Sequence, residues 1–438
     1  MESPVTVRIE KMIPGGKGLA FHQGKAVFVP QSAPGDLIRI QSLRDRGNYF
    51  QALAFEILEP GVDRVTPPCP FFGACGGCDF QQMNYSQQLS SKRDLLLDSL
   101  RRIGKLGIPP EIMNVFPSPP QHYRNRIQLK LTPGQLPPHW GFYAGGSHQV
   151  CEVDDCLIVT KTLWEAAQCF GGLLNRLEDL QGELDEVEIL EGDDRSYLVN
   201  LVLSKREKVS PSLLRLLKQR LEESNAGLEW TVTLKNSLGR EERVWGNGYV
   251  WKSVGEFRYR VSHGAFFQIN EMMLSTLQTQ AMADYSGKLA LDLFSGVGFF
   301  TLPLTRRFES LVAVEVNPDA ALDLRANLEI NRAVNCRTVA LDVQEYLRQE
   351  SSRVGSEPDL LLMDPPRAGL PPETVKRIAG LRAQKLIYVS CDPATLARDL
   401  SLLVKEDYEI VSVDLLDLFP QTHHLEGVAR LQRTSKKR

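Results

Sequence analysis

The chain has 438 residues, of which 42% are apolar, and its 51 basic and 54 acidic side chains give a formal net charge of −3 at pH 7. This length predicts about three domains, and the composition excludes a disordered or a polybasic protein, so any nucleic-acid-binding surface has to be local. The first residues lack a basic start followed by an apolar run, and no later stretch is apolar enough for a membrane span. We therefore expect a cytoplasmic protein without a membrane partner.

Residues 1–60 alternate between polar and apolar side chains, as at 5–9 and 26–29, and glycine-rich turns separate the runs. This pattern is typical of a small β-barrel. Basic residues are interleaved with aromatic ones, which suits an OB-like barrel that binds nucleic acid, although solvated charges on an ordinary barrel would give the same composition. These residues are Lys11, Lys17, Lys25, Arg39, Arg44 and Arg46, with Phe21, Phe28, Tyr49 and Phe50.

Three cysteines follow in the arrangement Cys69-x5-Cys75-Gly-Gly-Cys78. In a large chain without a secretory signal, such clustering indicates a metal site rather than disulfides. Either Cys151 or Cys156 can supply a fourth thiolate, and four thiolates suit an iron–sulfur cluster. Structural zinc is the alternative, but zinc sites more often show two closely spaced cysteine pairs.

The region between these cysteines and residue 260 predicts first a helix and then a mixed domain. A helical pattern runs from about Asn84 to Leu106, and the prolines from 109 to 120 end it. Residues 120–260 are rich in strand patterns, with one helix at 211–223, and indicate an α+β domain. Arg124, Arg126 and Lys130 alternate along one strand and suit either phosphate contacts or a plain solvent face.

From residue 261 onward, strands and helices alternate regularly, which predicts a doubly wound, mostly parallel sheet of the Rossmann type. The predicted strands are Leu289–Leu293, Leu311–Glu315, Arg337–Leu341, Leu360–Asp364, Lys385–Ser390 and Glu409–Val413.

The first two of these strands end in residues that suit a nucleoside cofactor. Gly296 and Gly298 lie in a turn where backbone can approach a ligand, and Glu315 can accept hydrogen bonds from ribose hydroxyls. A third glycine is missing, which weakens the prediction of a dinucleotide site. The same layout suits S-adenosylmethionine, which has a ribose but no pyrophosphate, and an NAD enzyme is the alternative at this point. The fourth strand ends in Asp364-Pro365-Pro366-Arg367. Amine methyltransferases carry an aromatic residue where Arg367 stands, so this turn argues against amine methylation.

Cys391 lies where a buried strand becomes a helix, because Asp392 suits an N-cap and Pro393 the first helical position. Ligands are handled at this end of parallel strands. The helix dipole favours the thiolate by about 0.3–1 kcal/mol, whereas activation near pH 7 needs about 2 kcal/mol and Asp392 opposes it. The substrate or another hydrogen-bond donor must therefore help to form the thiolate. The alternative to a reactive cysteine is a buried structural one.

Together these motifs closely resemble the RNA (uracil-5-)methyltransferases, in the branch with an N-terminal TRAM domain and a four-iron cluster. The resemblance implies a class I methyltransferase domain in which Cys391 is the nucleophile and Glu426 the base that removes the C5 proton. Its most specific parts are Cys69-x5-Cys75-Gly-Gly-Cys78, Phe267-Gln268-x-Asn270, Asp292-x-Phe294-x-Gly296-x-Gly298, Asp364-Pro365-Pro366-Arg367, Ser390-Cys391-Asp392-Pro393 and His423-His424-Leu425-Glu426. It further assigns cofactor and base binding to Gln268, Phe294, Glu315, Asp364, Gly296, Gly298 and Asp342, and a 4Fe-4S cluster to Cys69, Cys75, Cys78 and Cys156.

The expected activity is S-adenosylmethionine-dependent methylation of uridine C5 in RNA, with 23S ribosomal RNA preferred and transfer RNA as the second candidate. A cytosine-C5 enzyme is disfavoured, because its nucleophile commonly follows proline and Cys391 follows Ser390. An RNA-binding protein on a retired methyltransferase scaffold is the non-enzymatic alternative. We expect a monomer with a TRAM-like barrel at 1–60, the cluster segment and helix at 61–119, an RNA-binding α+β domain at 120–260 and the methyltransferase domain at 261–438.

Overall fold

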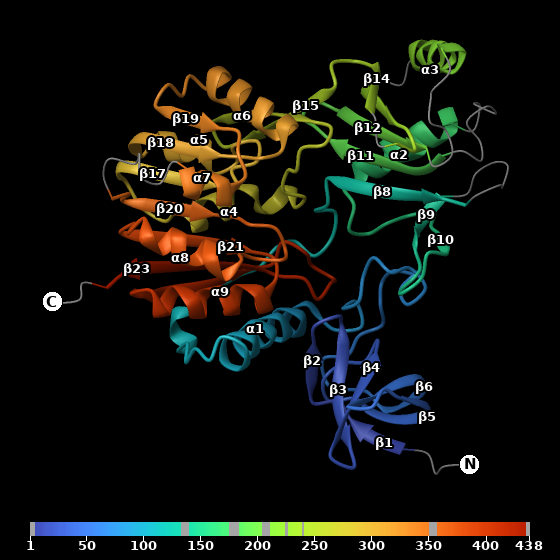
Figure 1. Ribbon diagram of the computed structural model, residues 1–438. Helices are drawn as coiled ribbons and strands as arrows, with labels where there is room; N and C mark the ends of the chain where they lie inside the picture. The colour runs from blue at the N-terminus through green and yellow to red at the C-terminus, as the bar shows by residue number, and fades with distance from the viewer. Residues whose placement is uncertain are drawn as a thin grey trace.

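The computed structural model shows a small N-terminal sheet, a central sheet and a large C-terminal α/β lobe (Figure 1). No helix in the described part of the chain combines the length and apolarity needed to cross a membrane. The structure describes residues 5–132, 140–174, 184–203, 211–223, 227–238, 241–349 and 357–434.

The N-terminal sheet has six strands in the order β1-β5-β6-β4-β3-β2 and curls around a small apolar core. Alternate residues fill this core, as Val27 and Val29 of β4 do, because successive side chains of a strand point to opposite faces. The strands are β1 (Val5–Arg8), β2 (Lys11–Ile13), β3 (Lys17–His22), β4 (Lys25–Pro30), β5 (Leu37–Asp45) and β6 (Tyr49–Glu59).

The central lobe is a seven-stranded mixed sheet in the order β10-β9-β8-β11-β12-β13-β14. The basic residues of β8 meet acids of the neighbouring strand β11: the Arg126 guanidinium lies 2.7 Å from the Glu188 carboxylate, and Lys130 pairs with Glu186. The elements are β8 (Arg126–Leu131), β9 (Trp140–Tyr143), β10 (Val150–Glu152), α2 (Lys161–Leu174), β11 (Leu184–Glu191), β12 (Ser196–Leu203), α3 (Pro211–Glu223), β13 (Glu229–Lys235) and β14 (Glu241–Trp245), followed by the hairpin of β15 (Tyr249–Val254) and β16 (Phe257–Ser262).

The C-terminal lobe contains an eight-stranded sheet in the order β19-β18-β17-β20-β21-β23-β22-β7. The strand β23, which the sequence patterns did not predict, runs antiparallel to both of its neighbours. The elements are η3 (Glu271–Met273), α4 (Leu274–Met282), β17 (Gly287–Leu293), α5 (Thr301–Thr305), β18 (Phe308–Val314), α6 (Pro318–Ile330), β19 (Cys336–Val339), α7 (Val343–Gln349), β20 (Leu360–Met363), α8 (Pro372–Gly380), β21 (Lys385–Ser390), α9 (Pro393–Lys405), β22 (Tyr408–Leu416) and β23 (Glu426–Arg433).

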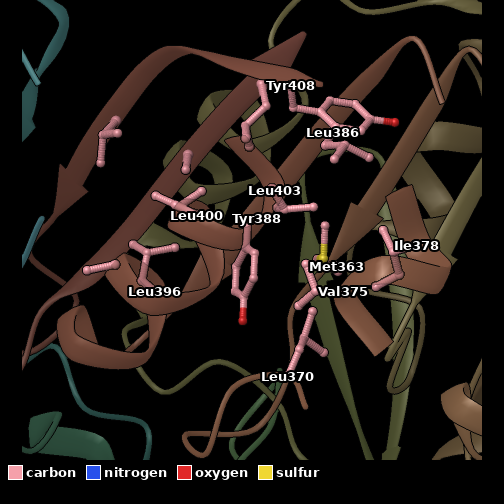
Figure 2. Packing of buried hydrophobic residues seen from close by; sticks show 14 of the residues in the cluster. Met363, Leu370, Val375, Ile378, Leu386, Tyr388, Leu396, Leu400, Leu403 and Tyr408 are labelled. Atoms are coloured by element: carbon pink, nitrogen blue, oxygen red, sulfur yellow. The ribbon is translucent and has the colours of Figure 1, made fainter. Parts of the chain in front are cut away.

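One face of this sheet is covered by α9, whose apolar residues recur every three or four positions (Figure 2). Leu396, Leu400 and Leu403 are fully buried there. The hydroxyl of Tyr388 on β21 donates to Asp399 of α9 at 2.6 Å, which ties the helix to the strand that carries the Cys391 turn. Packing of α9 therefore fixes the position of Cys391.

The segment that precedes the central lobe also packs on the C-terminal lobe. Helix α1 (Tyr85–Arg102), which is capped by Asn84, lies along α9, and β7 (Val115–Phe116) extends the sheet beside β22 after the short turn η1 (Pro110–Ile112). A buried ion pair fastens this contact: the Lys92 ammonium lies 2.5 Å from Asp417, and both side chains are 0% exposed.

Candidate active site

Strand register brings the predicted cofactor residues to one edge of the sheet. Leu293 of β17 is opposite both Val314 of β18 and Met363 of β20. The strands are parallel, so the residues that follow these three positions leave the sheet side by side. They are Phe294, Glu315 and Asp364; the doubly wound pattern predicted Glu315 and Asp364 at strand ends, and the resemblance added Phe294.

The turn after β17 is shaped to receive a ligand. Gly296 and Gly298 have φ values of 55° and 93°, a region that favours glycine. A Cβ atom at Gly298 would lie 2.8 Å from Leu324, whereas one at Gly296 would meet nothing within 4 Å, so the open side of the turn is at Gly296. The Glu315 carboxylate joins the two loops, because it accepts the N–H of Gly296 and of Asn317 at 2.7 Å each.

Two further predicted residues lie on neighbouring loops. Asp342 accepts the N–H of Gln344 at 2.8 Å and thereby caps the start of α7. Gln268 is 8% exposed on the loop after β16, where its carbonyl accepts the side-chain amide of Asn125 at 3.3 Å. The central lobe thus helps to hold a loop of the predicted cofactor site.

Asp292, the residue before the end of β17, belongs to the quoted glycine motif but was not predicted as a site residue. It is 1% exposed, it accepts the Thr301 hydroxyl at 2.5 Å, and its Oδ1 atom has no hydrogen-bond partner. Burial raises its pKa to about 7, with smaller contributions from Asp364 and Glu315. An unpartnered buried carboxylate oxygen at a ligand-binding edge is a candidate acceptor for a cationic ligand.

The proposed nucleophile and base come together through the reversed strand. Ser390 at the end of β21 is opposite Gly427 near the start of β23, so the next pair outward is Cys391 and Glu426. Asp392 caps α9 as predicted, accepting the N–H of Ala394 at 3.0 Å and of Thr395 at 2.8 Å. Cys391 is half-buried, whereas Glu426 is 4% exposed.

Burial and neighbouring charges shift the pKa values of these two residues. Burial, and then the Glu426 charge, raise the pKa of the Cys391 thiol to about 11, while the Arg367 guanidinium opposes the rise. Burial and the neighbouring Asp364 hold the pKa of Glu426 well above its usual range. Arg367 is therefore a cation beside both Cys391 and Glu426, a role that the motif alone did not reveal.

The predicted metal-ligating cysteines line one cavity of ≈ 260 Å³ at the junction of the cysteine segment with the central lobe. Its walls include Cys69, Cys75, Cys78 and Cys156, and also Phe142 and Tyr143 of β9. The backbone N–H of Gly77 donates to Cys75 Sγ at 3.4 Å. Within the described residues, no three or more His, Cys, Asp or Glu side chains are arranged to hold a single metal ion.

Comparison with known proteins indicates the same class of reaction. The family described as tRNA (Uracil-5-)-methyltransferase matches residues 84–434. An uncharacterized RNA methyltransferase of Aquifex aeolicus is 32% identical over 98% of this chain and 99% of its own, and the 23S rRNA (uracil(1939)-C(5))-methyltransferase RlmD of Shewanella amazonensis is 32% identical over 98% and 96%.

A solved structure, the tRNA (uracil-54, C5)-methyltransferase of Pyrococcus abyssi in complex with S-adenosyl-L-homocysteine, superimposes with a TM-score of 0.74 at 26% identity and covers 98% of this chain and 100% of that one. These findings confirm the predicted fold class, enzyme class and methyl-donor cofactor. The chain belongs to the tRNA (uracil-5-)-methyltransferase family of S-adenosylmethionine-dependent enzymes.

Proposed function

We propose that the protein methylates C5 of a uridine in RNA through a covalent bond between Cys391 and C6 of the base. The observation that carries the mechanism is the register of β21 and β23, which puts Cys391 and Glu426 opposite each other next to the cofactor edge. Family membership supplies the methyl donor and the class of acceptor.

The reaction needs Cys391 in its first step and Glu426 in its last. Uracil C5 is too weak a nucleophile to take a methyl group directly, so the Cys391 thiolate adds to C6 and creates an enolate. C5 then attacks the methyl carbon, and the carbon–sulfur bond of the sulfonium breaks, which leaves S-adenosylhomocysteine. Glu426 removes the remaining C5 proton, the C5–C6 double bond re-forms, and the bond to Cys391 breaks with release of the thiolate.

A buried carboxylate with a raised pKa is a stronger base than an exposed one once it is ionised, so Glu426 must lose its own proton before it can accept the one on C5. Arg367 and the bound sulfonium, both cations, favour the thiolate of Cys391 against the effect of burial. We propose that a group of residues at the sheet edge binds the cofactor, and that Asp364 also contacts the uracil ring. The cofactor residues are Gln268, Phe294, Gly296, Gly298, Glu315, Asp342 and Asp364.

We propose 23S ribosomal RNA as the substrate, because the Shewanella relative named for that RNA matches nearly the whole chain. Transfer RNA is the alternative, supported by the name of the Pyrococcus enzyme. A base must leave its stack to reach Cys391, at a cost of a few kcal/mol. The barrel at 1–60 and the domain at 120–260 would bind the RNA and supply that energy. Residues 61–119 would link them to the methyltransferase domain at 261–438. The enzyme would act as a monomer in the cytoplasm.

We also propose that the cysteine cavity holds a 4Fe-4S cluster with Cys156 as the fourth ligand. Cys69, Cys75, Cys78 and Cys156 all line that cavity, whereas Cys151 is not among its lining residues. A zinc ion in the same four thiolates is the competing assignment. Anaerobic purification followed by iron, sulfide and zinc analysis decides between them, and a colourless protein with one equivalent of zinc would refute the cluster.

The activity is tested by transfer of radiolabelled methyl from S-adenosylmethionine to unmodified ribosomal RNA and, separately, to unmodified transfer RNA, with wild type and Cys391→Ala. We expect Cys391-dependent 5-methyluridine in ribosomal RNA. Label in transfer RNA alone would move the assignment to that substrate. RNA binding without label in either would support a non-catalytic RNA-binding protein.

A further inference from the structure

The loop between β22 and β23, residues 417–425, leads directly into Glu426 and is fixed at its centre by the cysteine segment. The carbonyl oxygen of Gln421 accepts the N–H of Asp79 at 3.1 Å and of Phe80 at 3.0 Å. Asp79 is the residue after Cys78, so only one peptide bond separates a wall of the cysteine cavity from this contact.

A second contact comes from helix α1. The side chains of Gln88 and Gln421 face each other, and Gln88 is 1% exposed. Gln88 Nε2 donates to Gln421 Oε1, and Gln88 Oε1 accepts the backbone N–H of Gln421, both at 3.0 Å. Gln421 has a φ of 67°, which a residue with a side chain rarely adopts, so these hydrogen bonds hold the loop in a conformation that it would not favour alone.

The cysteine segment makes a third contact with this loop, closer to Glu426. The Asp79 carboxylate lies 2.5 Å from Nδ1 of His423, three residues before Glu426. The ring centroids of His423 and His424 lie 4.2 Å apart, with the two ring planes tilted by 36°. Contacts thus run from the cysteine segment to Gln421 and His423, and His423 is three residues before Glu426 in the chain.

Cys391 is positioned differently. Its turn is held by the Asp392 cap and by the packing of α9 on β21, both within the methyltransferase lobe. Loss of the cysteine-segment contacts should therefore move Glu426 while Cys391 stays in place.

We propose that Gln88 and the Cys78–Phe80 segment are positioning elements for Glu426, and that the four-cysteine site thereby sets the rate of proton removal from C5 but not the rates of thiolate addition and methyl transfer. This inference rests on the proposed function, since it assigns Glu426 to the last step. It gives the cysteine site a role in the reaction that involves no electron transfer.

The test uses RNA tritiated at uridine C5 together with S-adenosylmethionine labelled in the methyl group, in single turnovers. Methyl incorporation reports the first steps, and tritium release reports proton removal. For Gln88→Ala we expect methyl incorporation within about twofold of wild type and tritium release slowed about ten- to a hundredfold. The methylated RNA should remain attached to Cys391 on a denaturing gel.

The matched control is Gln87→Ala, which lies one position away on α1 and whose side-chain amide donates to Ser91 within the same helix. It should leave both rates unchanged. Cys78→Ser and Asp79→Asn should reproduce the Gln88→Ala pattern, and hydrogen exchange of residues 417–425 should quicken in each; these variants also serve if Gln88→Ala does not fold.

If the wild-type enzyme is active but the variants slow methyl incorporation and tritium release equally, or release tritium at the normal rate, the inference is overturned and the proposed function stands. Absence of methylated uridine with wild-type enzyme would instead overturn the proposed function, and the inference with it.

Discussion

The buried pair of Lys92 and Asp417 should be among the most sensitive contacts in the protein. The Lys92 ammonium lies 2.5 Å from Asp417 and 2.9 Å from the carbonyl of Phe419, and both charged side chains are 0% exposed. Lys92→Met keeps the length of the side chain but leaves Asp417 with the Tyr85 hydroxyl, at 3.0 Å, as a remaining donor. Removing one partner of a buried pair costs about 3–5 kcal/mol, because the other charge stays desolvated.

A chain of several domains has no single unfolding free energy, so the appropriate assay is hydrogen exchange of α1. A loss of 3–5 kcal/mol corresponds to amide exchange in Tyr85–Arg102 that is faster by about a hundredfold or more. Lys11→Met is the matched control, since Lys11 pairs with Asp98 of the same helix at a partly exposed site. It should cost less than about 1 kcal/mol.

Adding Asp417→Asn to Lys92→Met should restore much of the protection, because the second change removes the unpaired charge. If Lys92→Met accelerated exchange no more than Lys11→Met, the reasoning that this contact is a desolvated ion pair would be wrong.

Three further predictions concern the site. The pKa of Asp292 rises from 3.8 to about 7 on folding, so ionisation opposes folding increasingly as pH rises through that window, by roughly 4 kcal/mol at its end. Asp292→Asn should therefore slow hydrogen exchange of β17 in the cofactor-free protein at pH 8, but it should weaken S-adenosylmethionine binding measured by calorimetry. Tighter binding would contradict this. Burial raises the pKa of Cys391 to about 11, so the rate of its alkylation by iodoacetamide in the absence of cofactor should increase up to pH 9 without a plateau. Mass spectrometry follows the modification, and a plateau near pH 7 would show that the thiolate is already formed. Glu426→Gln should accumulate methylated RNA bound to Cys391 on denaturing gels, and rapid release of product would assign the base elsewhere.

Much of the methyltransferase lobe could be predicted because its signals are local. Phe294, Glu315 and Asp364 each follow a short apolar run, and parallel strands place such positions at one edge whatever the intervening helices do. The cap at Asp392 and the proline after it likewise specify the start of α9 within a few residues.

Contacts between distant segments had no such signal. Nothing near Gln88 in the sequence indicates that its amide meets Gln421, since the two lie 333 residues apart and tertiary packing of α1 brings them together. Arg126 and Lys130 were suited equally to phosphates and to solvent, and the choice of partner depended on β11, which lies more than fifty residues away and places Glu188 and Glu186 beside them.

The reversal of β23 is the feature on which the chemistry depends most. In a wholly parallel sheet, a residue at the start of a strand lies at the amino edge, so Glu426 would be separated from Cys391 by the full length of β21. Because β22 and β23 form an antiparallel pair, the chain enters β23 at the edge where β21 ends, and Ser390 comes to lie opposite Gly427. A nucleophile at the end of one strand and a base at the start of another can then face the same uracil, and the loop that makes the reversal, residues 417–425, becomes the part of the fold whose position must be held.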